Sequence, residues 1–506
     1  MKGGIIMKKG KIKKSPREET TFTMILKFVP ILVLATLIIV FKLEIMVAAA
    51  ISCIAAGAIA IYINRKSVDD IVDIMAENSG KVAVVYLILM LAYCVAESFM
   101  RSGVGASIIN MSLKFGISGR TVAPVAFLVC CVLSVATGSS WGTFAACAPI
   151  FLWLNYIVNG NIVLTACAVA GGSCFGDNIG LISDTTVVSS GLNGVDIIDR
   201  VRHQGVWSIS CVAITAVLFF VFSMKLPGEV GSAEEAINAI PAEAWAALEE
   251  ERPSAIVLLN QVKAGVPYYM VIPMLVVVGL AVTGISTMIC LGAGIVSAVI
   301  FGMIANTCTL SRLVNDILPN GFADAGSFSV ALILWITAFS GIVASMDAFA
   351  PLGRLVVRCS KKVRHLMTWN AVIALLCNAA FADEMAEITT SVPITKALID
   401  DNVEGSEEDL YTLRLRNATF ADALGVYGSQ LIPWHCYIAF YVSLANAIFP
   451  MYQFKPSTFI THNIMAIVAC ASIILLTFTG LDRFIPGFKL PSESKVHLKT
   501  VQNTKA

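Results

Sequence analysis

The stretch Phe175–Thr186 reads FGDNIGLISDTT, and the related stretch Phe420–Val426 reads FADALGV. Aligned at an offset of 245 residues, the two share the pattern F-small-D-x-aliphatic-G-aliphatic. A second match lies upstream, where Pro149-Ile150 of TGSSWGTFAACAPI aligns with Pro393-Ile394 of FADEMAEITTSVPI at an offset of 244. Because two local matches share nearly the same offset, the chain is predicted to contain an internal repeat.

The composition of the chain is that of a membrane protein. Of its 506 residues, 57% are hydrophobic and only 14% are charged, whereas charged residues make up about 25% of an ordinary soluble domain. This balance excludes a soluble enzyme and a disordered protein. The net charge of +1 provides no field that would attract nucleic acid. Nor does the sequence contain a P-loop, an H-E-x-x-H or a G-x-S-x-G motif, so we expect no enzyme activity.

Apolar runs long enough to cross a bilayer as helices recur along the whole chain. The uninterrupted runs are Met24–Phe41, Ile45–Tyr62, Val82–Phe99, Thr121–Thr137, Val206–Met224, Tyr268–Thr283, Ser286–Ala305, Phe328–Ala344, Leu366–Phe381 and Ile464–Thr479. Three others, Gly142–Asn159, Asn161–Ser190 and Ala418–Phe449, are interrupted by Gly, Pro or acidic residues. The predicted fold is therefore an all-α polytopic membrane protein with roughly twelve to fourteen spans.

The distribution of basic residues predicts the orientation of the chain in the membrane. The first 17 residues hold seven Lys or Arg and no acid, and Arg354–His365 holds five and no acid. By the positive-inside rule both segments lie in the cytoplasm. Lys225–Lys263, with seven Glu against three basic residues, fits the outside. We therefore expect a multi-pass protein of the cell membrane, with both termini cytoplasmic.

These features divide the chain into seven segments. They are a basic cytoplasmic N-terminus (1–23), N-terminal spans (24–120), a first transport repeat (121–224), an acidic extracytoplasmic loop (225–266), connecting spans (267–353), a second transport repeat (354–480) and a cytoplasmic tail (481–506). The first repeat starts outside and the second inside, which predicts an inverted-topology pair with broken helices. Trp141–Tyr156 and Glu384–Leu398 either cross the membrane or form re-entrant hairpins.

Acidic residues inside or beside the apolar runs mark the candidate site. A charged side chain at the bilayer centre costs about 2.5–3.5 kcal/mol on insertion scales. The glycines of Gly171–Thr186, including Gly176 and Gly180, disfavour a regular helix, and unwound carbonyls are tolerated only where they line a cavity. Such carbonyls, together with nearby side chains, form a set of oxygen ligands suited to Na⁺. The side chains are those of Asp177, Asn178, Ser183, Asp184 and Thr185.

The second repeat contains acidic residues and a glycine at matching positions. Asp422 and Gly425 occupy the positions of Asp177 and Gly180. Asp383 and Glu387 are four residues apart and would share a helix face, where one is protonated or bridged by a cation. The predicted ion-binding and proton-coupling residues are thus Asp177, Asn178, Ser183, Asp184, Thr185, Asp383, Glu387 and Asp422. The predicted Na⁺ ligands among them are Asp177, Asp184 and Asp422. Hydroxyls of Ser139, Ser140 and Thr143 are weaker candidates.

At FGDNIGLISDTT the sequence resembles the NhaC family of Na⁺/H⁺ antiporters, within the ion transporter superfamily. That family carries a segment like FGD-x-x-SP-[IL]-SDTT, which is matched here by Phe175, Gly176, Asp177, Ile182, Ser183, Asp184, Thr185 and Thr186. The segments SSWGTFAACAPI and FADEMAEITTSVPI resemble the family's paired Pro-containing segments. One departure is that Gly180-Leu181 replaces the Ser-Pro dipeptide, so the helix break rests on glycine and one hydroxyl ligand is absent.

The resemblance implies a secondary antiporter that exchanges Na⁺ for H⁺ by alternating access. Its partners would be Na⁺, H⁺ and the lipid bilayer, with no cofactor beyond the transported Na⁺, and a homodimer is an open alternative to a monomer. Since some relatives exchange organic acids such as malate and lactate, a Na⁺- or H⁺-coupled carrier of a small organic acid or amino acid is the alternative. An intramembrane hydrolase is a third reading, for which His435 is the only deep histidine candidate.

Overall fold

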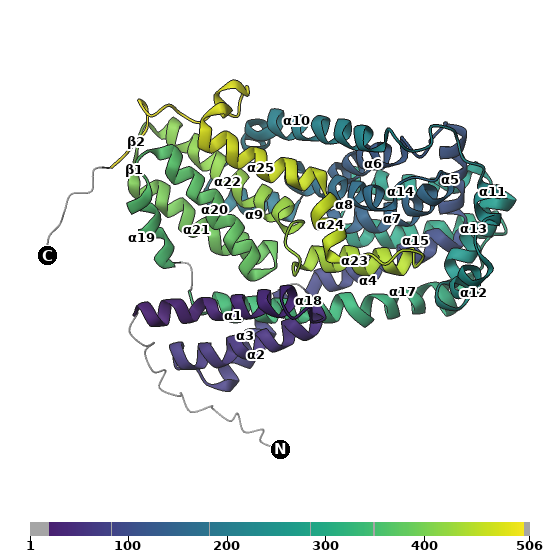
Figure 1. Ribbon diagram of the computed structural model, residues 1–506, viewed down its shortest axis with the longest axis horizontal. Helices are drawn as coiled ribbons and strands as arrows, with labels where there is room; N and C mark the ends of the chain where they lie inside the picture. Colours follow the sequence, from purple (N-terminus) through teal and green to yellow (C-terminus); the bar gives the residue numbers. More distant parts are fainter. Residues whose placement is uncertain (1–19, 82, 182, 284, 348–349, 500–506) are drawn as a thin grey trace, which may run out of the picture.

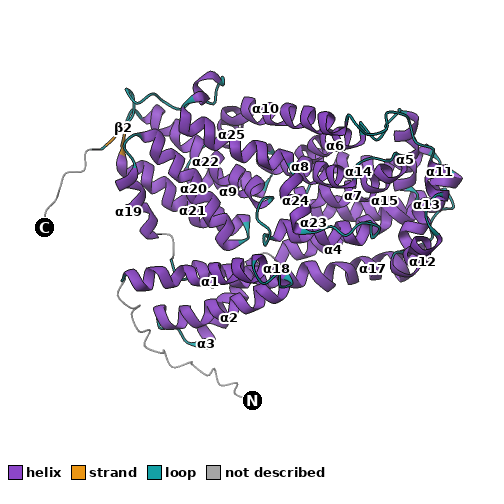
Figure 2. Cartoon of the chain, viewed as in Figure 1, coloured by secondary structure: helices purple, strands orange, loops and turns teal. Residues whose placement is uncertain are grey.

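The computed structural model describes residues 20–81, 83–181, 183–283, 285–347 and 350–499. Within them the chain is almost entirely helical, with one two-residue antiparallel ladder near the C-terminus (Figures 1 and 2). The predicted all-α fold is confirmed. Most of the basic N-terminus, residues 1–19, and the end of the tail, residues 500–506, lie outside the described residues.

The helices of the first half run in the order of the predicted segments. The N-terminal helices are α1 (Thr21–Ile39), α2 (Ile45–Asn64), α3 (Val68–Lys81), α4 (Ala83–Ser102) and α5 (Val104–Lys114). The first repeat contains α6 (Val122–Thr137), α7 (Ser140–Ile157), α8 (Ile162–Ile179), α9 (Asp184–Asn193) and α10 (Ile197–Ser223). The acidic loop folds into α11 (Ala233–Asn238), α12 (Ala242–Glu251) and α13 (Pro253–Ala264).

The second half begins with the connecting helices and ends with the second repeat. The connecting elements are η1 (Tyr268–Val271), α14 (Ile272–Val282), α15 (Thr287–Ile304), α16 (Leu310–Arg312), η2 (Leu313–Ile317), α17 (Leu318–Asp324), η3 (Ala325–Val330), α18 (Ala331–Ala344) and α19 (Ala350–Cys359). The second repeat and tail contain α20 (Val363–Phe381), α21 (Glu384–Asn402), β1 (Val403–Glu404), α22 (Glu407–Ser429), α23 (Cys436–Ile448), α24 (Pro456–His462), α25 (Ile464–Thr479), η4 (Leu481–Phe484) and β2 (His497–Leu498).

Seven helical stretches of the described chain are long and apolar enough to cross a membrane, or eight if α24 and α25, bent by 54° at their junction, count as one span. This is fewer than the twelve to fourteen predicted, because several predicted runs form helices that are too short, such as α14 and α23, or too polar, such as α21. Large apolar side chains such as Ile209 and Val217 of α10 are more than half exposed, as expected for a surface that faces lipid.

The internal repeat appears as two helical hairpins, α6–α7 and α20–α21. Each first helix ends in a left-handed residue, Gly138 at φ 61° and Ala382 at φ 54°. The next residue caps the second helix, since the Ser139 hydroxyl accepts from Gly142 N–H and the Asp383 carboxylate accepts from Ala386 N–H. Each second helix contains one proline at its matching position. The same turn is therefore built twice, 244 residues apart.

The tip of the first hairpin turns back partway along the bundle. A Cβ atom at Gly180 would lie 3.7 Å from the Cα of Gly138, so this tip is level with the end of α8. Beyond it α9 continues for 10 residues, or about 15 Å. That path leads to the base of the second hairpin, where the hydroxyl of Tyr411 in α22 accepts from Asp196 N–H at 3.0 Å.

The second hairpin enters the bundle from the opposite end. Its tip contacts the start of α23, where Cys436 N–H donates to the Ala382 carbonyl at 3.2 Å. α23 then runs for 13 residues to Ile448, whose carbonyl accepts from the Trp153 indole of α7 at 3.2 Å. Each tip is thus followed by a short helix that leads to the base of the other hairpin. In Figure 1 α20–α22 and α6–α8 accordingly occupy opposite ends of the molecule.

The prediction that the glycines of Gly171–Thr186 unwind the chain is wrong for most of them. Gly171, Gly172 and Gly176 lie inside α8, which ends only at Ile179, and α9 begins at Asp184. A Cβ atom at Gly176 would lie 1.9 Å from the carbonyl carbon of Ser134, so the glycines instead let α8 touch the backbone of α6. Gly425 also lies inside a continuous helix, α22, whose break comes later, before α23.

The C-terminal tail folds onto the base of the second hairpin. β2 pairs with β1 in the α21–α22 connection, with Val403 opposite Leu498. The fully buried Arg416 of α22 donates to the Phe488 carbonyl, and its guanidinium lies 3.6 Å from the centre of the Phe488 ring. The tail also contacts the segment Arg354–His365, because Glu493 accepts from the N–H groups of Val363 and Arg364.

Single-cysteine labelling tests the inverted arrangement. Of the fourteen cysteines, all among the described residues, only Cys359 is exposed, so Cys359→Ser provides a background of buried thiols. Glu229→Cys and Lys361→Cys, both at exposed positions, should then react with a membrane-impermeant maleimide from opposite sides of intact cells, Glu229→Cys from outside. Reaction of both from one side would contradict the arrangement.

Candidate functional site

The buried carboxylate of Asp177 lies where the tip of the first hairpin meets the end of α8. Its Oδ2 accepts from Ser140 N–H at 2.9 Å, from the Ser140 hydroxyl, and from the Tyr437 hydroxyl at 3.2 Å. Its Oδ1 accepts from the Ser183 hydroxyl at 3.4 Å. The donors come from α7, α23 and the break after α8, and no Lys or Arg forms an ion pair with Asp177 among the described residues.

The break after α8 adds further oxygen atoms beside Asp177. The hydroxyls of Thr185 and Thr186 donate to the Asp177 carbonyl at 3.2 and 2.9 Å, and the Ser183 and Thr185 hydroxyls lie 3.0 Å apart. The first turn of α9 therefore folds back over the end of α8. The Asp177 carboxylate and carbonyl therefore lie together with four hydroxyls, those of Ser140, Ser183, Thr185 and Thr186. Such a group of oxygen atoms is what coordination of a hard cation requires.

Tyr437 of α23 joins the two halves. Its hydroxyl lies 3.2 Å from Asp177 Oδ2 and 2.8 Å from Glu384 Oε1, in the first turn of α21. The Ser140 hydroxyl is a further 2.8 Å neighbour of the same phenol oxygen. Sequence reasoning did not select Tyr437, because a tyrosine in an apolar run is typical of core packing, and it left Glu384 out of the predicted ion-binding residues. The equivalence of Ser140 and Glu384 at the 244-residue offset was the available signal.

Asp422, the repeat equivalent of Asp177, lies in a different electrostatic setting. It forms an ion pair with Arg200 of α10 in which both side chains are fully buried. Asn178 and Thr186 also donate to its Oδ2, at 3.3 and 3.4 Å. Sequence reasoning missed Arg200, because a basic residue in the polar first turns of α10 is typical of a solvent-exposed helix end. The pair neutralises Asp422 in this conformation, so Asp422 differs from the predicted free Na⁺ ligand.

Arg200 also connects α10 to the broken segment. Its Nη2 donates to the Asn178 carbonyl at 2.9 Å and to Gln204 Oε1 at 3.1 Å, and Gln204 donates to the same carbonyl at 2.7 Å. The last turn of α8 is therefore held by amide and guanidinium groups. The predicted candidate Asn178 does lie here, fully buried, with its side chain on Asp422.

The acids of the second hairpin do not form the predicted pair on one helix face. Asp383 caps α21, with its Oδ1 accepting from Ala386 N–H at 2.8 Å. Glu387 is fully buried and accepts from the Ser391 hydroxyl at 2.6 Å, while its Oε2 has no hydrogen-bond partner among the described residues. A Cβ atom at Gly425 would lie 3.0 Å from that oxygen, so the glycine provides the space for the carboxylate.

Asp184, Asp177 and Asp422 are not brought together as three Na⁺ ligands. The Asp184 side chain is exposed at the start of α9, whereas those of Asp177 and Asp422 are buried. In the part of the chain that the structure describes, no group of three or more His, Cys, Asp or Glu side chains is arranged to hold a metal ion. Of the weaker hydroxyl candidates, Ser140 contacts Asp177. The Ser139 hydroxyl accepts from Gly142 N–H, and the Thr143 hydroxyl donates to the Ser139 carbonyl.

A membrane bundle of two oppositely inserted hairpins, whose tips meet at buried carboxylates, defines the class of the protein as a transporter. The Na⁺/H⁺ antiporter family model matches residues 18–224 and 172–481. The two matched ranges together cover both hairpins and all of the site residues. The chain therefore belongs to the Na⁺/H⁺ antiporter family.

Named relatives of this chain transport different solutes. The Na⁺/H⁺ antiporter NhaC of Alkalihalophilus pseudofirmus is 24% identical, over 83% of this chain and 89% of its own length. The arginine/ornithine antiporter ArcD of Halobacterium salinarum is 23% identical, over 80% of each chain. The malate-2H⁺/Na⁺-lactate antiporter of Bacillus subtilis is 32% identical, over 28% of this chain and 30% of its own.

The contact of α8 with α6 beside the site is predicted to tolerate no side chain at Gly176. Because the added methyl group would overlap the backbone at Ser134, Gly176→Ala should destabilise the protein by at least about 2 kcal/mol or prevent folding. Gly191→Ala, at an exposed position of α9 with no atom within 4 Å of the new Cβ, is the matched control and should be neutral. Melting temperature in detergent measures both, and equal stability of the two variants would contradict the packing.

Proposed function

We propose that this protein is a secondary antiporter that exchanges Na⁺ for H⁺ across the cytoplasmic membrane by alternating access. The observation that carries the proposal is the environment of Asp177. This carboxylate is 5% exposed and has hydroxyl and amide donors but no cationic partner among the described residues.

Such a carboxylate needs a bound proton or a bound cation. A desolvated charge without a counter-ion is strongly disfavoured, and a few hydrogen bonds compensate it only in part. Protonation removes the charge, and a Na⁺ ion held by Asp177 with the hydroxyls of Ser140, Ser183 and Thr185 neutralises it. Because either occupant meets the same requirement, each should exclude the other, which is sufficient for exchange.

The hairpins supply a physical basis for alternating access. Their tips approach the site from opposite ends of the bundle. The Tyr437 hydroxyl contacts Ser140 and Asp177 at the first tip and Glu384 at the second. A small displacement of one tip would therefore change the site's access to one end without requiring the other hairpin to move. Membership of the Na⁺/H⁺ antiporter family and the similarity to NhaC support Na⁺ and H⁺ as the exchanged ions.

A second candidate is a Na⁺- or H⁺-coupled carrier of a small organic acid or amino acid. It is favoured by Arg200, a fully buried cation whose Nε and Nη1 have no acceptor among the described residues. Either nitrogen could donate to a substrate carboxylate while Nη2 keeps Asp422. The names of two relatives, which transport arginine and ornithine or malate and lactate, are compatible with this alternative.

Asp177→Asn tests the assignment of the exchange site. The amide cannot carry the negative charge that both ions require, so Na⁺-driven proton movement in proteoliposomes with an internal pH dye should fall to the level of empty liposomes. Asp184→Asn is the matched control, because it makes the same chemical change at an exposed position, and it should retain most of the exchange. Wild-type exchange by folded Asp177→Asn would reject the site.

The proposed exchange site also predicts that Na⁺ and H⁺ compete for Asp177. Below the protonation midpoint of the site, each unit of pH decrease should weaken the apparent Na⁺ affinity about tenfold, as for one exchanged proton. Above that midpoint, affinity should be independent of pH, and Asp177→Asn should abolish both binding and its pH dependence. We expect this from Na⁺ titrations between about pH 6 and 9.

Organic solutes in the same assay separate the two candidate functions. Exchange that needs only Na⁺ and H⁺ supports the antiporter. An absolute requirement for malate, lactate, arginine or ornithine would replace it with the carrier. A flat Na⁺ affinity over the whole pH range would remove competition as the mechanism.

A further inference from the structure

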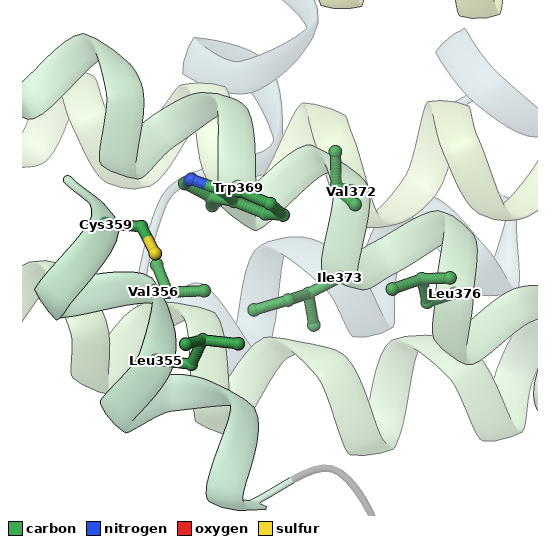
Figure 3. Close-up of a pocket in the computed structure, with 7 residues that line it drawn as sticks. All are labelled: Leu355, Val356, Cys359, Trp369, Val372, Ile373 and Leu376. Atoms are coloured by element: carbon green, nitrogen blue, oxygen red, sulfur yellow. The ribbon is translucent and has the colours of Figure 1, made fainter. Parts of the chain in front are cut away.

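An apolar groove whose lining contains no acidic residue lies between α19 and α20 (Figure 3). We propose that this groove binds an anionic phospholipid of the bilayer, with an acyl chain between the two helices and the phosphate headgroup against Arg358, Lys361 and Lys362. The proposal is independent of which solute the protein transports.

The shape and lining of the groove suit a hydrocarbon chain. It offers about 300 Å³ of space, part of it open to the surroundings, and is lined by apolar side chains and the Cys359 thiol. The lining from α20 extends from Trp369 to Leu376, seven residues or about 10 Å along the helix. Figure 3 shows Cys359 and Trp369 at one end and Leu376 at the other. An elongated apolar segment fits this space, whereas a polar solute would find only the Trp369 indole N–H and the Cys359 thiol as hydrogen-bonding groups.

The groove opens to the outside of the bundle. Leu355, Trp369 and Leu376 are 55%, 39% and 48% exposed, which for a membrane-embedded helix means exposure to lipid. Trp369 lies about two turns from the start of α20, at the end of the groove nearest the basic residues. Tryptophan is enriched at the depth of the lipid headgroups, so this end is the expected position of the headgroup.

The charges beside this end favour an anionic lipid over a neutral one. Arg358, Lys361 and Lys362 are exposed and form no ion pair with any described residue. No acid occurs between residues 350 and 382. Two acids that contact the neighbouring Val363 and Arg364 are already engaged, since Asp482 pairs with Arg364 at 2.7 Å and Glu493 accepts from the N–H groups of Val363 and Arg364. Clusters of this kind attract anionic headgroups at the cytoplasmic surface.

The bound lipid would contact the second hairpin directly. α20 is the first arm of that hairpin and leads to the tip that carries Asp383 and Glu384. A chain lying between α19 and α20 would fill the space between this arm and its neighbour. Occupancy of the groove could thereby stabilise the position of the arm from the lipid side.

Thiol protection tests the proposal on the full chain. Cys359 lines the groove and is the one exposed cysteine of the fourteen. In nanodiscs, replacing half of the phosphatidylcholine with phosphatidylglycerol should slow maleimide labelling of Cys359 at least about threefold, which corresponds to two-thirds occupancy. The triple variant Arg358→Gln/Lys361→Gln/Lys362→Gln should lose this difference.

Two controls separate specific binding from a general effect of surface charge. Lys225→Gln/Lys263→Gln/Lys455→Gln removes the same charge from exposed positions far from the groove in sequence and should keep the protection. Cys359→Ser/Glu229→Cys places a reporter thiol at an exposed position far from the groove in sequence, and its labelling should not depend on the lipid. Equal slowing of that reporter, equal labelling of Cys359 in both lipids, or full protection in the Arg358/Lys361/Lys362 variant would overturn the proposal.

Discussion

The structure depends on how the carboxylates at the junction of the two hairpins are compensated. A single charge at the bilayer centre costs about 2.5–3.5 kcal/mol on insertion scales, and here Asp177, Glu387 and Asp422 are all nearly or fully buried. Asp422 is compensated by Arg200, and Asp177 by hydroxyl and amide donors. The donors come from elements far apart in sequence, so the site can exist only when both halves are assembled.

Close backbone packing brings these elements within reach. Ser140, which donates to Asp177, follows the tip of the first hairpin, and α8 carries Asp177 itself. The two can meet because Gly176 lets α8 touch α6 at Ser134, whose hydroxyl accepts from Gly176 N–H at 2.8 Å. Small residues serve the same purpose wherever helices approach closely in membranes. Helix packing and site chemistry are therefore coupled in this half of the protein.

The fold was largely predictable from the sequence, and the site only in part. Hydropathy identifies the membrane helices, and the repeat offset of 244 places both turns, because local caps and prolines recur at matching positions. Asp177 could be found from the same repeat, and Asn178 from its place as an oxygen ligand beside Asp177 in the glycine-rich segment. Arg200 and Tyr437 could not, since their roles arise from tertiary contacts with residues more than 200 positions away. Asp184 was selected for its neighbours in sequence, but the turn into α9 leaves its side chain exposed.

The two repeats are similar in backbone and unequal in charge. At the 244-residue offset, Ser140 and Thr143 of the first hairpin correspond to Glu384 and Glu387 of the second, so one tip presents hydroxyls and the other presents carboxylates. The aspartates of the two repeats show the opposite difference in charge. Asp422 in α22 is paired with the Arg200 guanidinium, whereas Asp177 in α8 has no such partner among the described residues. A symmetric pair of sites would bind the same ion twice. Of the two repeat-related aspartates, this asymmetry leaves Asp177 as the one without a resident cation, and hence as a position where a mobile proton or cation can complete the compensation.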